Sequence, residues 1–158
     1  MAKSRDNRDI DEIDRIIINK LREDSKIANT EIAKQAKRKP STVHMRIKQL
    51  KQIGILKQYT VILDLKKLGY TAYIILVQLQ NHNGETVENF TQVIQHIPEI
   101  TECHKITGAN DYIIKVVLKR TEDLNEFLQT RIHAIEGICT ETYQVLETNK
   151  LSPAPPIT

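Results

Sequence analysis

The residues with the clearest chemical meaning in this 158-residue chain lie around a predicted helix from Pro40 to Ile53. Pro is favoured at the first position of a helix, and three cations stand directly before it. Cations there oppose the helix dipole but suit a phosphate backbone. If Val43 faces the core, the opposite face carries side chains able to reach base edges in a major groove. We expect DNA contacts from Lys37, Arg38, Lys39, Ser41, Thr42, His44, Met45, Arg46, Lys48 and Gln49.

Arg46 has two interpretations that the sequence does not separate. It lies at the edge of the apolar face of the predicted helix, about 60° from Val43. From there it can contact DNA, or it can pair with Asp11 or Asp14 of the first predicted helix.

A second candidate site is the segment from Gly108 to Asp111, Gly-Ala-Asn-Asp. Tight turns use Gly, Asn and Asp, so the pattern alone indicates only a hairpin.

The sequence offers little support for a catalytic site or a metal site. Cys103 and His104 are neighbours in a predicted strand, so their side chains point to opposite faces and cannot act as a nucleophile and its base. The five histidines show no i,i+4 spacing, and no CxxC, P-loop or GxGxxG is present. We therefore expect no enzyme, no metal and no cofactor. Two cysteines, Cys103 and Cys139, allow one bridge, but a reducing cytoplasm is the simpler assumption.

The elements that position the first site form a helix-turn-helix over residues 1–54. A helix from about Asp9 to Glu23 has acidic residues at its start and isoleucines on one stripe. Asn29 is suited to cap a short helix over Thr30–Ala36, and Gly54 is suited to end the third helix.

The pattern of the chain after residue 54 predicts an α+β ferredoxin-like sandwich with the element order βαββαβ. Residues 55–70 are expected to be a linker strand and hinge, residues 71–150 the sandwich, and residues 151–158 an irregular tail. The predicted strands are 72–79, 100–107, 112–118 and 138–146, and the predicted helices are 85–96 and 121–135. Helices cover only one sheet face in this fold, yet the strand from Ala72 to Leu79 is apolar on both sides, which indicates oligomerisation.

The charge of the chain changes sign near the boundary between the two predicted domains. Residues 1–60 hold 15 Lys and Arg against 8 Asp and Glu, whereas residues 61–158 hold 8 against 12. The asymmetry indicates polyanion binding by the first part only, or a solvated helix surface. No apolar run is long enough to cross a membrane, and the polar start, MAKSRDNRDIDE, is unlike a secretory signal.

From Ile10 to Asn149 the chain resembles the Lrp/AsnC family of transcription regulators. Four segments carry the resemblance: Ile10-Asp11-x-Ile13-Asp14-x2-Ile17, Asn29-x2-Ile32-Ala33, Pro40-Ser41-Thr42-Val43-x2-Arg46-Ile47-x2-Leu50-x3-Gly54-Ile55 with Tyr59-Thr60, and Glu102-Cys103-His104-x2-Thr107-Gly108-x2-Asp111-Tyr112 with Gly137-Ile138 and Thr142-Tyr143. The family usually has a glycine where Lys37 stands and a serine cap where Lys39 stands.

The resemblance implies a winged-type helix-turn-helix joined to a RAM-type sandwich that dimerises through its sheet and binds amino acids between dimers. It implies an effector site built from Thr107, Gly108, Ala109, Asn110, Asp111, Tyr112, Thr142, Tyr143 and Gln144. Asp111 would meet the ligand ammonium group. Gln144 stands where the family is often apolar, which favours a polar ligand side chain.

We therefore expect a cytoplasmic, nucleoid-associated transcription regulator. It would bind double-stranded DNA as a dimer, tetramer or octamer and respond to an amino acid. One alternative is an architectural, chromatin-like protein that coats DNA and senses nothing. An enzyme on the same scaffold is a second, and no catalytic constellation supports it.

Overall fold

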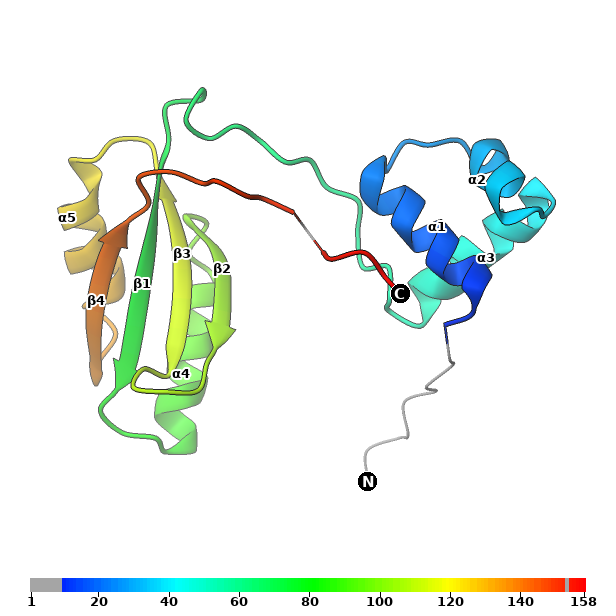
Figure 1. Cartoon of the computed structure of the whole chain (residues 1–158). Helices are drawn as coiled ribbons and strands as arrows, with labels where there is room; N and C mark the ends of the chain where they lie inside the picture. Colours follow the sequence, from blue (N-terminus) through cyan, green and yellow to red (C-terminus); the bar gives the residue numbers. More distant parts are fainter. Residues whose placement is uncertain (1–9, 153) are drawn as a thin grey trace. The chain divides into compact units, whose positions relative to one another are not determined.

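The computed structural model describes residues 10–152 and 154–158 and divides the chain into two compact units. One unit comprises the chain up to Val61 together with Lys150–Thr158, and the other comprises Ile62–Asn149. Each is described by itself below (Figure 1).

The first unit contains three helices, α1 (Glu12–Glu23), α2 (Asn29–Ala36) and α3 (Pro40–Gln52). Each helix contributes apolar side chains from one stripe, because an amphipathic helix this short is stable only when that stripe is buried. Their common core is small and consists of Ile17, Leu21, Ile32, Ala33, Val43 and Leu50. The predicted helix-turn-helix is present.

Two of the expected helix starts are wrong in detail. Asp9 lies outside the described residues, and α1 is capped by Asp11, whose Oδ1 accepts the Asp14 N–H at 2.9 Å. Asn29 is not a cap, because α2 begins at Asn29 itself and the extended residue before it is Ala28. The end of α3 follows the expectation, since Gly54 has φ +78° and the Ile55 N–H returns to the Leu50 carbonyl.

The linker strand expected within residues 55–70 is not formed. The segment is irregular, because no other strand of the described chain offers it a ladder. Val61, Ile62 and Leu63 are 72%, 57% and 54% exposed. A turn from Asp64 to Tyr70 follows, closed by the hydrogen bond from the Tyr70 N–H to the Leu65 carbonyl.

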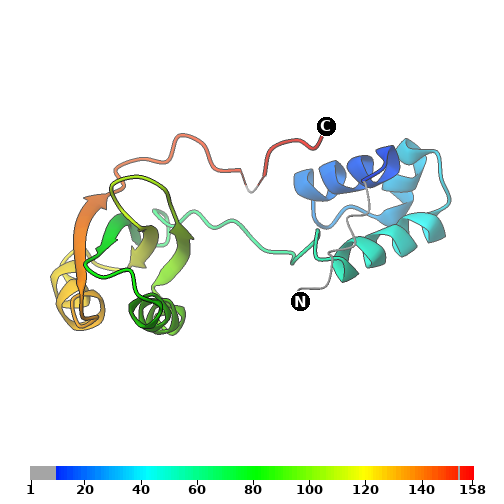
Figure 2. The same cartoon turned by 90° about the horizontal axis from the view of Figure 1, so that it is seen from below.

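The second unit is the predicted α+β sandwich. Four strands, β1 (Thr71–Leu79), β2 (Ile100–Lys105), β3 (Tyr112–Leu118) and β4 (Ile138–Gln144), form an antiparallel sheet of order β2-β3-β1-β4. Two helices, α4 (Gly84–Gln95) and α5 (Asp123–Phe127), cover the same face of that sheet (Figure 2).

The two faces of the sheet differ in cover. On the helix side, alternate residues of β1 and β3 are buried, among them Tyr73, Ile75 and Ile114. On the other side Ile74 and Leu76 are only half-buried, and no element of this unit covers them. The two-sided apolar character expected for β1 is therefore present, with one side left open.

The last predicted helix, 121–135, is much shorter than expected. α5 ends at Phe127, and a π-helical turn over Leu128–Ile132 replaces its continuation. Thr121 does not cap it, because the residue before α5 is Glu122 and makes no side-chain cap bond. Within this stretch the Thr130 hydroxyl donates to the Glu126 carbonyl at 2.8 Å, a local bond of the kind that bends helices.

Candidate nucleic-acid interface and ligand-binding hairpin

α3 presents a polar, cationic surface that its packing holds in place. Val43 and Leu50 are buried beneath it, whereas Ser41, His44, Met45 and Lys48 are exposed. Thr42 and Gln49 are half-buried at its edges. Three of the exposed side chains have polar groups that can donate hydrogen bonds, as base edges and phosphates require.

The turn before α3 concentrates positive charge on solvent-exposed side chains. Lys37, Arg38 and Lys39 are all exposed, and the first turn of α3 contains no acid. None of the three forms an ion pair with a residue that the structure describes. Their charge is therefore available to a polyanion rather than used internally.

Both departures from the family pattern have structural consequences. Lys37 adopts a left-handed conformation (φ +50°, ψ +47°), the region that glycine occupies without cost. Lys39 precedes α3 in an extended conformation and provides no side-chain cap. The helix N-terminus thus keeps its N–H groups unsatisfied by side chains, an arrangement that favours anions.

Arg46 pairs with the acids of α1. Its Nη1 lies 2.7 Å from Asp11 Oδ2 and 3.2 Å from Asp14 Oδ2. The Asp14 side chain is only 3% exposed, so it needs this partner. The Asp14 N–H and the Arg46 guanidinium together hold the pKa of Asp11 below its usual value. Of the two interpretations of Arg46, the structure adopts the ion pair, which fixes α3 to α1.

The aspartate of the Gly108–Asp111 hairpin attaches this hairpin to the end of β1. Asp111 Oδ2 accepts the Leu79 N–H at 2.7 Å, and Oδ1 lies 2.9 Å from His82 Nε2. The Asp111 N–H donates to the Val77 carbonyl at 2.8 Å. The Leu79 N–H, and secondarily His82, lower the pKa of this carboxyl. Gly108 has φ +132°, which side chains rarely tolerate.

The carboxylate assigned to a ligand ammonium group therefore already binds the end of β1. His82 is one of the five histidines whose spacing gave no sign of a site. Nothing local could identify its partner, because 29 residues separate it from Asp111. Only the β1–β3 pairing brings the two together.

The two halves of the expected effector site do not meet within one chain. Thr142, Tyr143 and Gln144 pair with Tyr73–Ile75 on the edge strand β4. The hairpin adjoins β1 further along, at Val77 and Leu79. Strand β1 stands between β4 and β3, so the two segments are separated across the sheet.

Tyr112, the last residue of the expected hairpin set, is largely a core residue. It is 4% exposed, and its ring centroid lies 4.7 Å from that of Phe90. Thr107, Gly108 and Ala109 are exposed, and Asn110 is half-buried.

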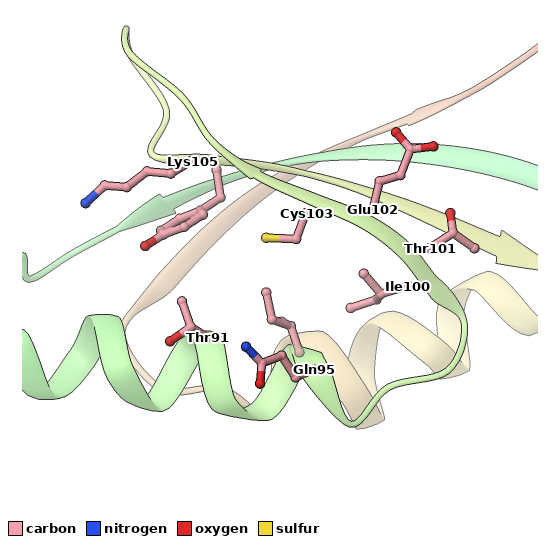
Figure 3. Close-up of a pocket in the computed structure, with 9 residues that line it drawn as sticks. Thr91, Gln95, Ile100, Thr101, Glu102, Cys103 and Lys105 are labelled. Carbon is pink, nitrogen blue, oxygen red and sulfur yellow. The ribbon is translucent and has the colours of Figure 1, made fainter. Parts of the chain in front are cut away.

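A groove of about 400 Å³ lies between α4 and β2. Thr91 and Gln95 line it from the helix, facing Cys103 and Lys105 from the strand (Figure 3). Burial raises the pKa of the Cys103 thiol, so it favours the unreactive protonated form. Sequence reasoning did not anticipate this groove, because its walls come from separate elements. Tyr112 is the one residue of the expected effector set that lines it.

Two further observations concern the part of the chain that the structure describes. No helix there has the length and apolarity to cross a bilayer. No group of three His, Cys, Asp or Glu side chains there has an arrangement that could hold a metal ion.

A helix-turn-helix with a cationic third helix, followed by a ferredoxin-like sandwich, defines a two-domain DNA-binding regulator. Comparison with protein families agrees. Residues 10–51 match the AsnC-type helix-turn-helix domain, and residues 72–155 match the Lrp/AsnC ligand binding domain. The chain belongs to the Lrp/AsnC family of transcription regulators.

Individual relatives extend over nearly the whole chain. The transcriptional regulator AzlB of Bacillus subtilis is 35% identical over 94% of this chain and 96% of its own. The structure of Escherichia coli AsnC is 29% identical, with a TM-score of 0.83, over 93% of this chain and 99% of that one. A Neisseria meningitidis regulator, NMB0573, solved as a complex with L-Met, has a TM-score of 0.85 at 23% identity and covers 94% of this chain and 97% of that one. AzlB and NMB0573 are both named as transcriptional regulators.

Proposed function

We propose that this regulator reads DNA with α3 as a homo-oligomer, and that an amino acid bound by its sandwich domain changes its assembly and its DNA affinity. The observation that carries the proposal is the exposed surface of α3. It is cationic at its start, polar along its length, and locked to α1 by the Arg46 ion pair.

An oligomer would allow two α3 helices to bind DNA together, which a single copy cannot do. Two α3 helices related by a two-fold axis would reach successive major grooves, so each dimer would recognise a two-part site. The open face of the sheet, with Ile74 and Leu76 half-buried, supports pairing of two copies through their sheets. Tetramers or octamers would follow from further contacts between dimers. We place this activity in the cytoplasm, on nucleoid DNA.

The effector is proposed to bind where hairpins and β4 edges of different subunits meet. This follows from the separation of Thr142–Gln144 and Gly108–Asp111 within one chain. The ammonium group of the ligand would bind the Asp111 carboxylate, either together with His82 or in its place. The N–H groups of the turn would bind the carboxylate of the ligand. Gln144 favours a polar ligand, whereas the L-Met complex of NMB0573 adds methionine as a specific candidate.

A thermal-shift screen against the twenty amino acids tests the effector part. A ligand at a hundred times its dissociation constant stabilises the protein by about 2.7 kcal/mol, which is readily measured. The variant D111A should lose this response, whereas D64A, which removes a carboxylate from an exposed turn, should keep it. Absence of any shift across the panel would contradict amino-acid sensing and favour the architectural alternative.

A further inference from the structure

The outer side of α1 binds the C-terminal segment of the chain. The Asn19 carboxamide makes two hydrogen bonds with the backbone of one residue: its Nδ2 donates to the Ile157 carbonyl, and its Oδ1 accepts the Ile157 N–H, both at 2.9 Å. One turn further along α1, Arg22 Nη1 donates to the Ala154 carbonyl at 3.4 Å. Asn19, Arg22, Ala154 and Ile157 are all half-buried.

The composition of the segment suits this mode of binding. Residues 151–158 read Leu-Ser-Pro-Ala-Pro-Pro-Ile-Thr. Proline restricts the backbone before binding and has no N–H, so the segment loses little entropy and exposes few donors. An extended, proline-rich chain makes no internal ladder, which leaves its carbonyls to side chains such as Asn19 and Arg22.

The paired bonds of Asn19 select a backbone and not a side chain. A primary amide offers one acceptor and two donors, and it matches the N–H and C=O of a single residue as a neighbouring strand would. Because Pro155 and Pro156 lack an N–H, Ile157 is the residue after them that can complete this pair.

The contact between α1 and the C-terminal segment matters because of the path that the chain takes. The chain leaves the helical unit after Val61 and rejoins it at Lys150. The sandwich unit is thus an insertion within the DNA-binding unit, connected to it by residues 55–70 on one side and by the C-terminal segment on the other. α1 is also the helix that holds α3, through Asp14 and Arg46.

We propose that the outer side of α1 is a docking surface for residues 154–158 of the same chain, and that the C-terminal segment is a second tether between the sandwich and the DNA-binding unit. The docked segment stabilises α1, and through α1 it stabilises the position of α3. The recognised ligand is a backbone with an N–H directly after a proline pair.

A double-mutant cycle on the full-length protein tests the proposal. N19A should lower the melting temperature of the helical unit by about 2–4 °C in the complete chain. In a chain that ends at Lys150 the same substitution should have no effect, because its partner is gone. The control K20A removes the neighbouring exposed ion pair with Glu23 and should act equally in both backgrounds. An N19A effect of equal size in both backgrounds would overturn the proposal.

Amide exchange gives a second readout that does not depend on stability. The Ile157 N–H should exchange at least about tenfold more slowly in the complete chain than in N19A, while the terminal Thr158 N–H is unchanged. An Ile157 N–H that exchanges as fast as Thr158 in the unsubstituted protein would refute docking. Neither measurement uses DNA or an amino acid, so a negative result here leaves the proposed regulatory function standing, and the reverse also holds.

Discussion

Arg46 and Lys48 lie two residues apart on α3, yet their surroundings differ. Arg46 is paired with Asp11 and the buried Asp14, whereas Lys48 is exposed. R46A should therefore destabilise the helical unit by about 1–3 kcal/mol, because Asp11 and the nearly buried Asp14 carboxylate lose a charged hydrogen-bond donor. R46K, which keeps one charge, should recover part of that loss. Chemical denaturation followed by circular dichroism measures both, and an R46A protein as stable as its parent would show that the pair is dispensable.

K48A should behave in the reverse manner. We expect an unchanged melting temperature, a weaker affinity for duplex DNA, and a salt dependence reduced by about one counterion per subunit. Titrating fluorescent duplex DNA at several salt concentrations gives the slope. A slope equal to that of the parent protein would remove Lys48 from the interface.

Asp111 makes the sandwich sensitive to acid. Because the Leu79 N–H and His82 lower its pKa in the folded state, its contribution to stability is present above the unfolded pKa of about 3.9. That contribution is lost as pH falls through the lowered folded value. The gap in melting temperature between the parent and D111N should thus be largest near neutral pH and close below about pH 4. A gap that does not vary with pH would contradict the hydrogen-bonding role assigned to this carboxylate.

At the scale of elements, the turn between α2 and α3 stores strain at Lys37. A non-glycine residue in the left-handed region costs about 1–2 kcal/mol, so K37G should raise the stability of the helical unit by about 1 kcal/mol. It should also weaken DNA binding, because a cation is lost. The control K34G places glycine inside α2 and should lower stability by about 0.5–1 kcal/mol. Thermal denaturation of both variants measures these changes in stability. A K37G protein less stable than its parent would contradict the claim that Lys37 is strained.

Elements with local signals were predictable from sequence, and elements set by distant partners were not. Pro40 and Gly54 mark α3 to within a residue, since both act through their own backbone. The strands follow from alternating β-branched residues. In contrast, whether residues 55–63 form a strand depends on a ladder partner that no local pattern specifies.

The candidate site shows the same division. The exposed face of α3 follows from helix periodicity once Val43 is taken as buried. The pairing of Asp111 with His82 and the docking of Ile157 on Asn19 join residues 29 and 138 positions apart. Such contacts depend on strand register and on the path of the chain. The π-helical turn after α5 was missed because its apolar stripe looks the same as that of an α-helix.

At the scale of the whole molecule, the open sheet face predicts self-association. Leu76 lies at the centre of β1 and half-buried on that face, so L76D would place an unpaired charge in the interface between two copies. We expect the variant to shift to monomer in analytical ultracentrifugation at micromolar concentration. The control Q92D adds the same charge at an exposed position of α4, on the helix-covered side of the sheet, and should leave the assembly intact. A Leu76→Asp protein of unchanged size would exclude this face as the interface.

Hydroxyl-radical footprinting on genomic DNA fragments at physiological salt tests the central claim most directly, because it reports where and how the assembled protein contacts the duplex. If paired α3 helices read DNA, the protected sites should be discrete, and each should have two symmetric halves. These halves should lie about one helical turn apart, or about 10 base pairs. Uniform protection along every fragment, or no protection at all, would contradict the claim that α3 reads sequence.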